Sequence, residues 1–281
     1  MKEIKNMEFG GERPLFAEHD LKLENVTIHT GESSLKRCSH IVARNCTFDG
    51  KYPFWHCVDF DVRDCLFKSG ARAALWYSKD CVMKDCIVEA PKMFRMMMGI
   101  DVERTKFTDA QETLWDCTDI RLRNVEMHNC DYLFMHSHKL DIDHYEHHGN
   151  YSFQYCTDSI IRNAMIYSKD AFWNTDNLTI IDSEMHGEYL GWYSKNLTLI
   201  NCHISGTQPL CYIDNLTLIN CTFDPDCDLA FEESNVKAEV ASRITSVKNP
   251  RHGIIKAKSI GDIIIDKNVI PDSDCKIVVA E

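Results

Sequence analysis

The sequence has no uncharged apolar run of about 18 or more residues, the length that a membrane-spanning helix needs. Basic residues are also scarce, because 31 Lys and Arg stand against 43 Asp and Glu. The net charge of -12 opposes binding to nucleic acid and to anionic membrane surfaces, so neither is expected as a partner. The segment MKEIKNMEFGGERPLF lacks the apolar core of a secretory signal, and we therefore expect a cytoplasmic protein.

C-x-x-C pairs are missing as well, although the chain has 14 cysteines. Their absence argues against a structural zinc site, and we predict neither a metal nor a cofactor. Since the chain is long and lacks a signal, we expect reduced thiols and no disulfide framework. A hydrophobic content of 44% with 26% charged residues indicates a globular protein and excludes disorder.

A short phrase recurs along the chain with a period of about twenty residues. It reads ENVTI at 24–28, RNCTF at 44–48, RDCLF at 63–67, KDCIV at 84–88, RNVEM at 123–127, INCHI at 200–204 and INCTF at 219–223. We call the second residue of each copy the anchor. The anchors are Asn25, Asn45, Asp64, Asp85, Arg104, Asn124, His144, Asn163, Asp182, Asn201 and Asn220. Most are Asn or Asp, which tolerate left-handed backbone angles in tight bends.

Apolar residues alternate on both sides of the anchors, as strands require, and helical periodicity is missing. Leu197 and Leu199 precede Asn201, and Cys202 and Ile204 follow it. The pattern predicts an all-β, single-domain parallel β-helix, a solenoid of about eleven regular turns of 19–21 residues plus terminal caps. We assign residues 1–20 to an N-terminal cap, 21–228 to the regular turns and 229–281 to irregular C-terminal turns and a cap. The cysteines that follow the anchors should point inward as small apolar residues.

Several local blocks resemble a known family. They are GERPLF at 11–16, GESSLK at 31–36, KYPFW at 51–55, ALWYS at 74–78, APKMFR at 90–95 and ETLW at 112–115. Together they resemble an uncharacterised bacterial domain-of-unknown-function family of pectin-lyase-like right-handed β-helix proteins. The resemblance implies a right-handed solenoid. The wider superfamily contains lyases and hydrolases of acidic polysaccharides, so a carbohydrate ligand is implied by analogy alone.

All five tryptophans occupy one position of the repeat, nine residues before an anchor: Trp55, Trp76, Trp115, Trp173 and Trp192. If this column faces outward, it forms an aromatic stripe for binding sugar rings. If it faces inward, the tryptophans fill the core of the solenoid. The sequence pattern leaves both interpretations open.

A column of charged residues precedes the tryptophans by three or four positions and includes Glu12, Glu32, Lys51, Arg72, Lys92, Glu112, Asp131, Asp170 and Glu188. Lys51, Arg72 and Lys92 are candidates for holding a carboxylate or phosphate of a ligand. Glu112 and Asp131 beside them are candidate catalytic residues, as acid and base. The alternative is a solvated column of ion pairs without function.

Histidines cluster between residues 128 and 148, at His128, His136, His138, His144, His147 and His148, with His186 further along. A metal site would need three of them to converge with a carboxylate such as Glu146 or Glu126. His144 and His147 instead occupy anchor and apolar positions, which favours interior substitutions in one irregular turn. We therefore assign no metal ligands.

Three successive copies of N-L-T-[IL]-I place Thr179, Ile181, Thr198, Ile200, Thr217 and Ile219 on one outward face. An exposed isoleucine row needs cover, which the C-terminal segment or a second copy of the chain can provide. Two functions follow. The first is binding or processing of an oligosaccharide or sugar acid at the tryptophan surface, and the alternative is a non-catalytic or self-associating scaffold.

Overall fold

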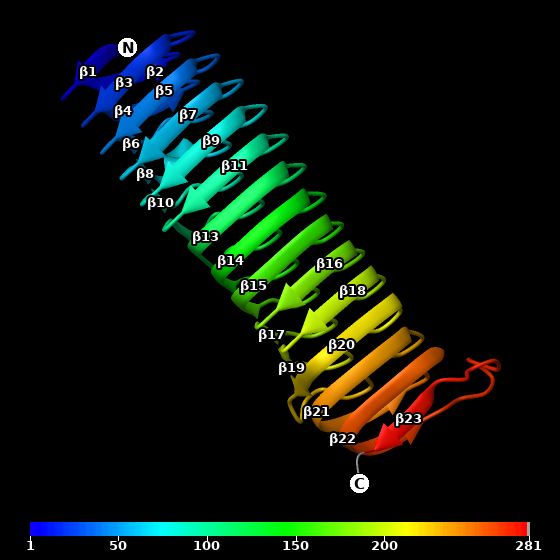
Figure 1. Cartoon of the computed structure of the whole chain (residues 1–281). Coiled ribbons are helices and arrows are strands. Elements are labelled where there is room, and N and C mark those ends of the chain that lie inside the picture. Colours follow the sequence, from blue (N-terminus) through cyan, green and yellow to red (C-terminus); the bar gives the residue numbers. More distant parts are fainter. Residues whose placement is uncertain (280–281) are drawn as a thin grey trace. The chain divides into compact units, whose positions relative to one another are not determined.

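The computed structural model describes residues 1–279, and the chain forms two compact units, Met1–His148 (unit 1) and Gly149–Glu281 (unit 2). Each unit is a parallel β-solenoid, and the chain has about 15 turns in all (Figure 1). The predicted all-β solenoid is confirmed. Among the described residues, helical structure is limited to one 3-10 turn, η1 (Ser69–Ala71). No helix in this range is both long and apolar enough to cross a membrane.

Unit 1 contains fourteen strands. They are β1 (Lys2–Lys5), β2 (Glu8–Glu12), β3 (His19–Glu24), β4 (Thr27–Glu32), β5 (Ser39–Arg44), β6 (Thr47–Phe48), β7 (Val58–Arg63), β8 (Leu66–Phe67), β9 (Lys79–Lys84), β10 (Ile87–Val88), β11 (Met98–Glu103), β12 (Lys106–Thr108), β13 (Thr118–His128) and β14 (His138–His148). The described part of unit 2 contains nine more. They are β15 (Thr157–Tyr167), β16 (Asp176–Ile181), β17 (Glu184–His186), β18 (Lys195–Ile200), β19 (His203–Ser205), β20 (Asp214–Phe223), β21 (Asn235–Lys248), β22 (His252–Ile264) and β23 (Lys276–Val279).

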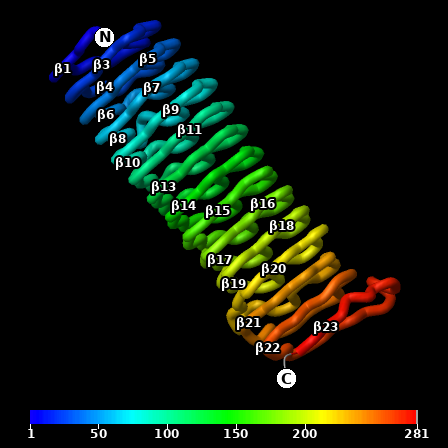
Figure 2. The backbone as a smooth tube through the Cα atoms, in the orientation of Figure 1, coloured from blue at the N-terminus to red at the C-terminus, as the bar shows by residue number. Residues whose placement is uncertain are grey.

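Most regular turns have the same order of parts, whereas β13, β14, β15 and β20 each continue through their anchor as one strand. A strand leads to the anchor, a second strand follows, and an irregular corner segment leads to the next turn, as in β5, Asn45, β6 and residues 49–57. The strand of one turn pairs in parallel with that of the next, with Ile41 opposite Phe60 and Ala43 opposite Val62. Figure 2 shows the backbone of each unit winding in this way. Residues about twenty apart are therefore neighbours.

The anchors adopt the left-handed conformation that the sequence predicts. All eleven have positive φ, between 44° and 55°, including Arg104 and His144, which are neither Asn nor Asp. Their side chains also bond between turns. Asn201 Nδ2 donates to Asp182 Oδ1 at 2.8 Å, and Asn220 Nδ2 donates to Asn201 Oδ1 at 2.9 Å. A polar ladder thus follows the bend on successive turns.

The core consists of the inward residues of the strands and corners. Phe48 stacks on Phe67 with ring centroids 4.8 Å apart, and Phe54 stacks on Phe60 at 5.4 Å. The cysteines are free thiols, and all are buried except the half-buried Cys275. Burial raises the pKa of the Cys117 thiol to about 12, so it stays protonated and packs as an apolar group.

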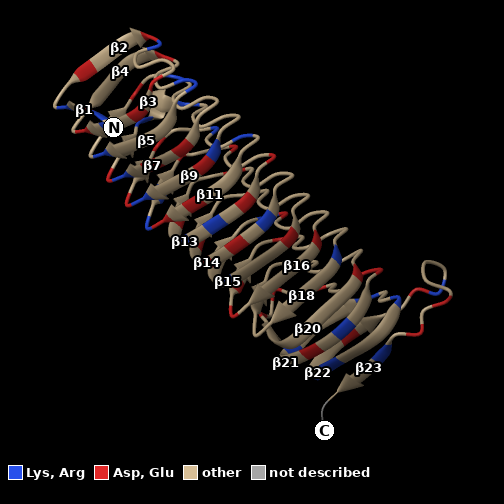
Figure 3. Cartoon of the chain, turned by 45° about the horizontal axis from the view of Figure 1, so that its top comes forward, with Lys and Arg blue, Asp and Glu red and all other residues tan. Residues whose placement is uncertain are grey.

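The C-terminal region continues the coil. β21 pairs in parallel with β22, and β22 with β23, so these three strands add turns to unit 2 instead of folding back over the isoleucine row. At the N-terminal end, β1 pairs with β3 and β2 pairs with β4. The residues of β1 and β2 are largely exposed. Charged residues of both signs are interspersed along the strands (Figure 3).

The anchor conformation can be tested at Asn201. Replacement by Ala forces a residue with a Cβ and no local polar group into the left-handed region, which costs about 1–2 kcal/mol. Replacement by Gly removes the same two side-chain hydrogen bonds without that strain. We expect Asn201→Ala to lower the melting temperature more than Asn201→Gly does, as measured by circular dichroism. Equal losses would show that the ladder, and not the backbone angle, stabilises the bend.

Candidate functional site

The corner segments decide where the tryptophans lie. In residues 52–57, φ is positive at Tyr52, Phe54 and His56, so every second residue of the corner is left-handed. This backbone breaks the two-residue alternation of a strand. Phe54 and Cys57 are buried, whereas Trp55 between them is half-buried at the surface. All five tryptophans have this half-buried position.

In unit 1 the tryptophan column is a ladder of aromatic rings and cations. Trp55 and Trp76 stack with centroids 5.2 Å apart and planes 8° apart. The Arg95 guanidinium lies between Trp76 and Trp115, at 4.9 Å and 4.2 Å from the ring centroids. The Lys36 ammonium covers Trp55 at 5.1 Å. We call Lys36, Trp55, Trp76, Arg95 and Trp115 the corner ladder.

Each indole of the ladder is also held by a hydrogen bond to the following turn. Trp76 Nε1 donates to the Lys92 carbonyl at 2.7 Å, and Trp55 and Trp115 donate likewise to Ala73 and Tyr132. The ring faces of Trp55 and Trp76 lie against Lys36, against each other and against Arg95, which leaves mainly their ring edges for a ligand. Stacking of a sugar on an open indole face, the form of binding that the sequence suggested, has little room between these rings.

Glu112 is bound by two cations. Its Oε2 accepts from Arg95 Nη2 at 2.6 Å and lies 3.2 Å from Lys92 Nζ. Burial opposes ionisation, but the hydrogen bonds from Arg95 and Lys92 outweigh it and lower the pKa of Glu112. Glu112 is therefore ionised at neutral pH, which suits electrostatic stabilisation of Arg95 better than donation of a proton.

The other candidates of the charged column lie on neighbouring turns. Lys51 and Arg72 are exposed, and neither forms an ion pair with any residue in 1–279. Asp131 is half-buried on the turn after Glu112, and its carbonyl accepts the Glu112 N–H at 2.9 Å. The structure thus brings Lys92 and Glu112 into contact and places Lys51, Arg72 and Asp131 along the same corner. Their roles in binding and catalysis stay predictions.

Two cations of this corner were not among the residues chosen from the sequence. Lys36 and Arg95 occupy the tryptophan position in their own turns, nine residues before Asn45 and Arg104. Their shared repeat position is the sequence signal for both, although only the tryptophans of this column are predicted to bind a ligand. Arg37 follows Lys36 and is exposed. Desolvation lowers the pKa of His56, and the charges of Lys36 and Arg37 lower it further, which indicates a positive local potential.

Unit 2 has a corner of different charge. Trp173 and Trp192 lie with ring centroids 5.7 Å apart, and Tyr193 stacks on Tyr212 at 4.9 Å. Trp192 Nε1 donates to the Gln208 carbonyl at 2.8 Å. The charged column here supplies Asp170 and Glu188. Burial raises the pKa of Asp170, and nearby Glu188 adds to the rise against the effect of Lys169.

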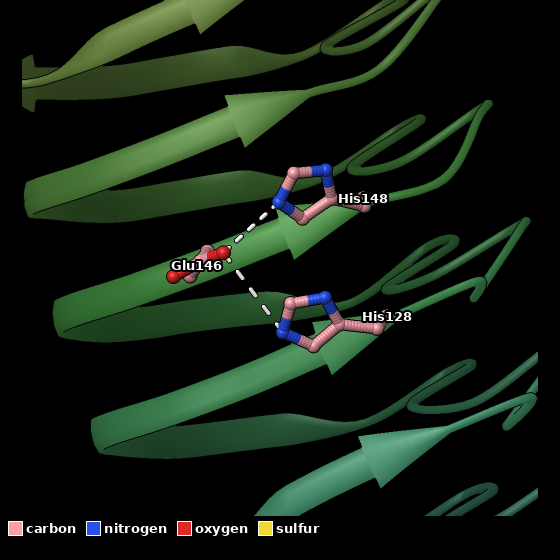
Figure 4. Close-up of side chains that lie close together, drawn as sticks. All are labelled: His128, Glu146 and His148. Atoms are coloured by element: carbon pink, nitrogen blue, oxygen red, sulfur yellow. Dashed lines mark hydrogen bonds and ion pairs between the residues drawn. The ribbon is translucent and has the colours of Figure 1, made fainter.

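Part of the histidine cluster converges on one carboxylate. His148 Nε2 lies 3.0 Å from Glu146 Oε1, and His128 Nε2 lies 3.9 Å from the same oxygen. The two imidazoles stack with centroids 5.0 Å apart (Figure 4). Among residues 1–279, these three are the one group of His, Cys, Asp and Glu side chains close enough to hold a metal ion together.

The remaining histidines of the cluster lie elsewhere. His147 is fully buried and stacks on Tyr145, with centroids 6.0 Å apart. His144 is an exposed anchor 3.0 Å from Asp143, and His136 lies 3.5 Å from Asp116. His138 is exposed at the start of β14. The interior position expected for His147 is correct, whereas His144 faces solvent because an anchor side chain points away from the core.

The predicted Thr/Ile face is present in unit 2. Thr179, Thr198 and Thr217 are in register, as are Ile181, Ile200 and Ile219. Ile219 is 43% exposed, and the other two isoleucines are half-buried. We call these six residues the Thr/Ile face.

The stacked turns define this molecule as a parallel β-solenoid whose side chains form columns along a corner. The model of a family of proteins of unknown function, DUF3737, matches residues 2–278, and the chain belongs to this family. The expectation of a β-helix family without assigned function is thereby confirmed. A comparison with curated proteins found no match.

Several solved structures show a distant similarity to the chain. A mannuronic-acid-specific polysaccharide family 6 lyase from human gut microbiota is 8% identical, with a TM-score of 0.40, over 97% of this chain and 87% of that one. The periplasmic alginate epimerase AlgG is 10% identical, with a TM-score of 0.34, over 94% and 76%. HetL, a pentapeptide repeat protein from the cyanobacterium Nostoc sp., is 8% identical, with a TM-score of 0.31, over 76% and 84%. The similarity to carbohydrate-active β-helix enzymes is thus distant.

Replacing Glu112 by Gln tests its ion pairs with Arg95 and Lys92. Because the pKa of Glu112 is lowered in the folded state, its contribution to stability is present above its unfolded value of about 4.5 and is lost as the pH falls through the folded value. We expect Glu112→Gln to reduce the free energy of unfolding by about 1 kcal/mol at pH 7. The difference from wild type should shrink below about pH 4.5.

The control for this prediction is Glu32→Gln, at the same column position but exposed and without an ion pair within residues 1–279. Thermal unfolding of the three proteins across this pH range is the measurement. A pH-independent loss in Glu112→Gln would mean that packing, and not charge, is responsible.

Proposed function

We propose that the protein binds an acidic oligosaccharide or a sugar acid along the corner of unit 1. The observation that carries the proposal is a set of cations without ion pairs in residues 1–279, on successive turns beside the tryptophans: Lys36, Arg37, Lys51 and Arg72. Other cations of unit 1 are neutralised by carboxylates, such as Lys84 by Glu103 and Arg123 by Asp141. A ligand that carries carboxylates would supply the missing negative charge.

The spacing of the turns favours a repeating ligand. Successive turns of a solenoid are about 4.8 Å apart, close to the length of one hexose residue in an extended chain, so cations on consecutive turns can meet consecutive acidic groups. The corner ladder holds this surface rigid, since each tryptophan is fixed by a neighbouring ring or cation and by its own hydrogen bond. Rigid cations lose little conformational entropy when a ligand binds.

The same geometry favours binding over bond cleavage. Glu112 is ionised and tied to Arg95 and Lys92, so it is poorly prepared to protonate a leaving group. Glu112 instead keeps Arg95 between Trp76 and Trp115.

The test is titration of the full chain with oligosaccharides of uronic acids and with neutral oligosaccharides of equal length, followed by tryptophan fluorescence and calorimetry. We expect binding of the acidic series and at least about tenfold weaker binding in Lys51→Ala/Arg72→Ala, because two charge-assisted contacts are lost. Lys195→Ala/Lys237→Ala makes the same change of net charge in unit 2 and should bind as wild type does. Equal weakening in both double variants, or no preference for acidic sugars, would contradict the proposal.

A second candidate function is self-association through the Thr/Ile face. It is favoured by the 43% exposure of Ile219 in a row of three turns that carries no charge. A second copy of the chain would bury this row against an equivalent one.

The mass in solution tests self-association. We expect a dimer or larger species in wild type and a monomer in Ile219→Lys, measured by light scattering after size exclusion. Val58→Lys, which changes a similarly exposed residue of unit 1, is the control and should keep the wild-type mass. A monomeric wild-type protein would exclude the candidate.

A further inference from the structure

The motif Glu-x-His occurs twice in unit 1, on two successive turns. β13 carries Glu126 and His128, and β14 carries Glu146 and His148. In register, Glu126 lies opposite Glu146, and His128 lies opposite His148. Since residues two apart on a strand share a face, the two copies form a square of two carboxylates and two imidazoles on the outer surface.

The geometry points to a site at which His128, Glu146 and His148 bind Zn²⁺ or a similar divalent metal ion. Imidazole nitrogen with one carboxylate oxygen is a donor set that suits Zn²⁺. The site is separate from the corner ladder and independent of the proposed carbohydrate binding.

The distances are close to those of a coordinated ion. Tetrahedral Zn²⁺ with bonds of about 2.0–2.1 Å places its ligand atoms about 3.3 Å apart. Here Glu146 Oε1 lies 3.0 Å from His148 Nε2 and 3.9 Å from His128 Nε2, and all three atoms lie within 4.8 Å of one another. Small rotations of the two imidazoles, by about 1 Å at each nitrogen, complete the geometry.

The environment of His128 Nε2 also indicates a bound metal ion. Its Nε2 atom is buried from solvent and has no hydrogen bond within the described residues. The nearest carboxylate oxygens, from Glu126 and Glu146, lie 3.4 Å and 3.9 Å away. A buried polar atom without a hydrogen bond is costly, and coordination to a metal would satisfy it.

Glu126 is not assigned as a metal ligand because its carboxylate already forms an ion pair with Lys106. The Lys106 ammonium donates to Glu126 Oε2 at 2.9 Å, and this hydrogen bond is the main cause of the lowered pKa of Glu126. Three protein ligands leave one further position in the tetrahedral coordination of the ion. That position can accept water or an oxygen of a bound molecule.

The experiment is calorimetric titration of the full chain, free of any histidine tag, with ZnCl₂, together with visible absorption spectra of the Co²⁺ form. We expect one bound ion per chain and a rise in melting temperature with metal concentration. His128→Gln, Glu146→Gln and His148→Gln should each weaken binding at least about tenfold, since even loss of an outer partner of a metal ligand costs this much.

Two controls carry the same groups without the square. His186 and Glu184 form a single Glu-x-His motif on β17. His29 Nε2 lies 2.9 Å from Glu8 Oε2 in a single His–Glu pair. His186→Gln and His29→Gln should bind Zn²⁺ as wild type does. Circular dichroism of every variant confirms the fold.

Three results would overturn the site. They are absence of Zn²⁺ binding to the folded wild type, unchanged binding in His128→Gln/His148→Gln, and a Co²⁺ spectrum with thiolate charge-transfer bands. The last would place the ion on cysteine.

Discussion

Parallel backbone pairing between successive turns is the constraint on which every other feature of this molecule depends. It fixes the turns about 4.8 Å apart and keeps residues of equal repeat position opposite each other. Pairing can continue only if each turn bends at the same place, and left-handed anchors provide that bend in all eleven repeats. Where Arg104 and His144 replace Asn or Asp, the backbone keeps the angle, which shows that the stacked turns enforce it.

This constraint turns single residues into columns. One tryptophan on a surface is unremarkable, but tryptophans and cations at one repeat position become a ladder in which each member covers the next. The ladder stabilises the corner and takes up the ring faces of Trp55 and Trp76 that a sugar would use. The free charges beside it, at Lys51 and Arg72, are then the better candidates for ligand contact.

The same mechanism assembles the His and Glu square. Neither strand alone holds enough ligands for a metal, since each contributes one imidazole and one carboxylate. Pairing of β13 with β14 doubles the set. The Glu-x-His spacing and its repetition after twenty residues were readable in the sequence, yet the cluster also contains His136, His138, His144 and His147, which hid the pair that converges.

The class of fold, the period, the left-handed anchors, the inward thiols and the register of the Thr/Ile face could all be predicted from the sequence, because each is a local property repeated many times. The direction of the tryptophan side chains depends on the folded corner, because every second residue of its backbone is left-handed and the strand rule does not apply there. The tertiary structure also decided which charges pair. Glu112 joins Arg95 and Lys92 through side-chain directions that a repeat position does not specify, and His128 and His148 share Glu146 for the same reason.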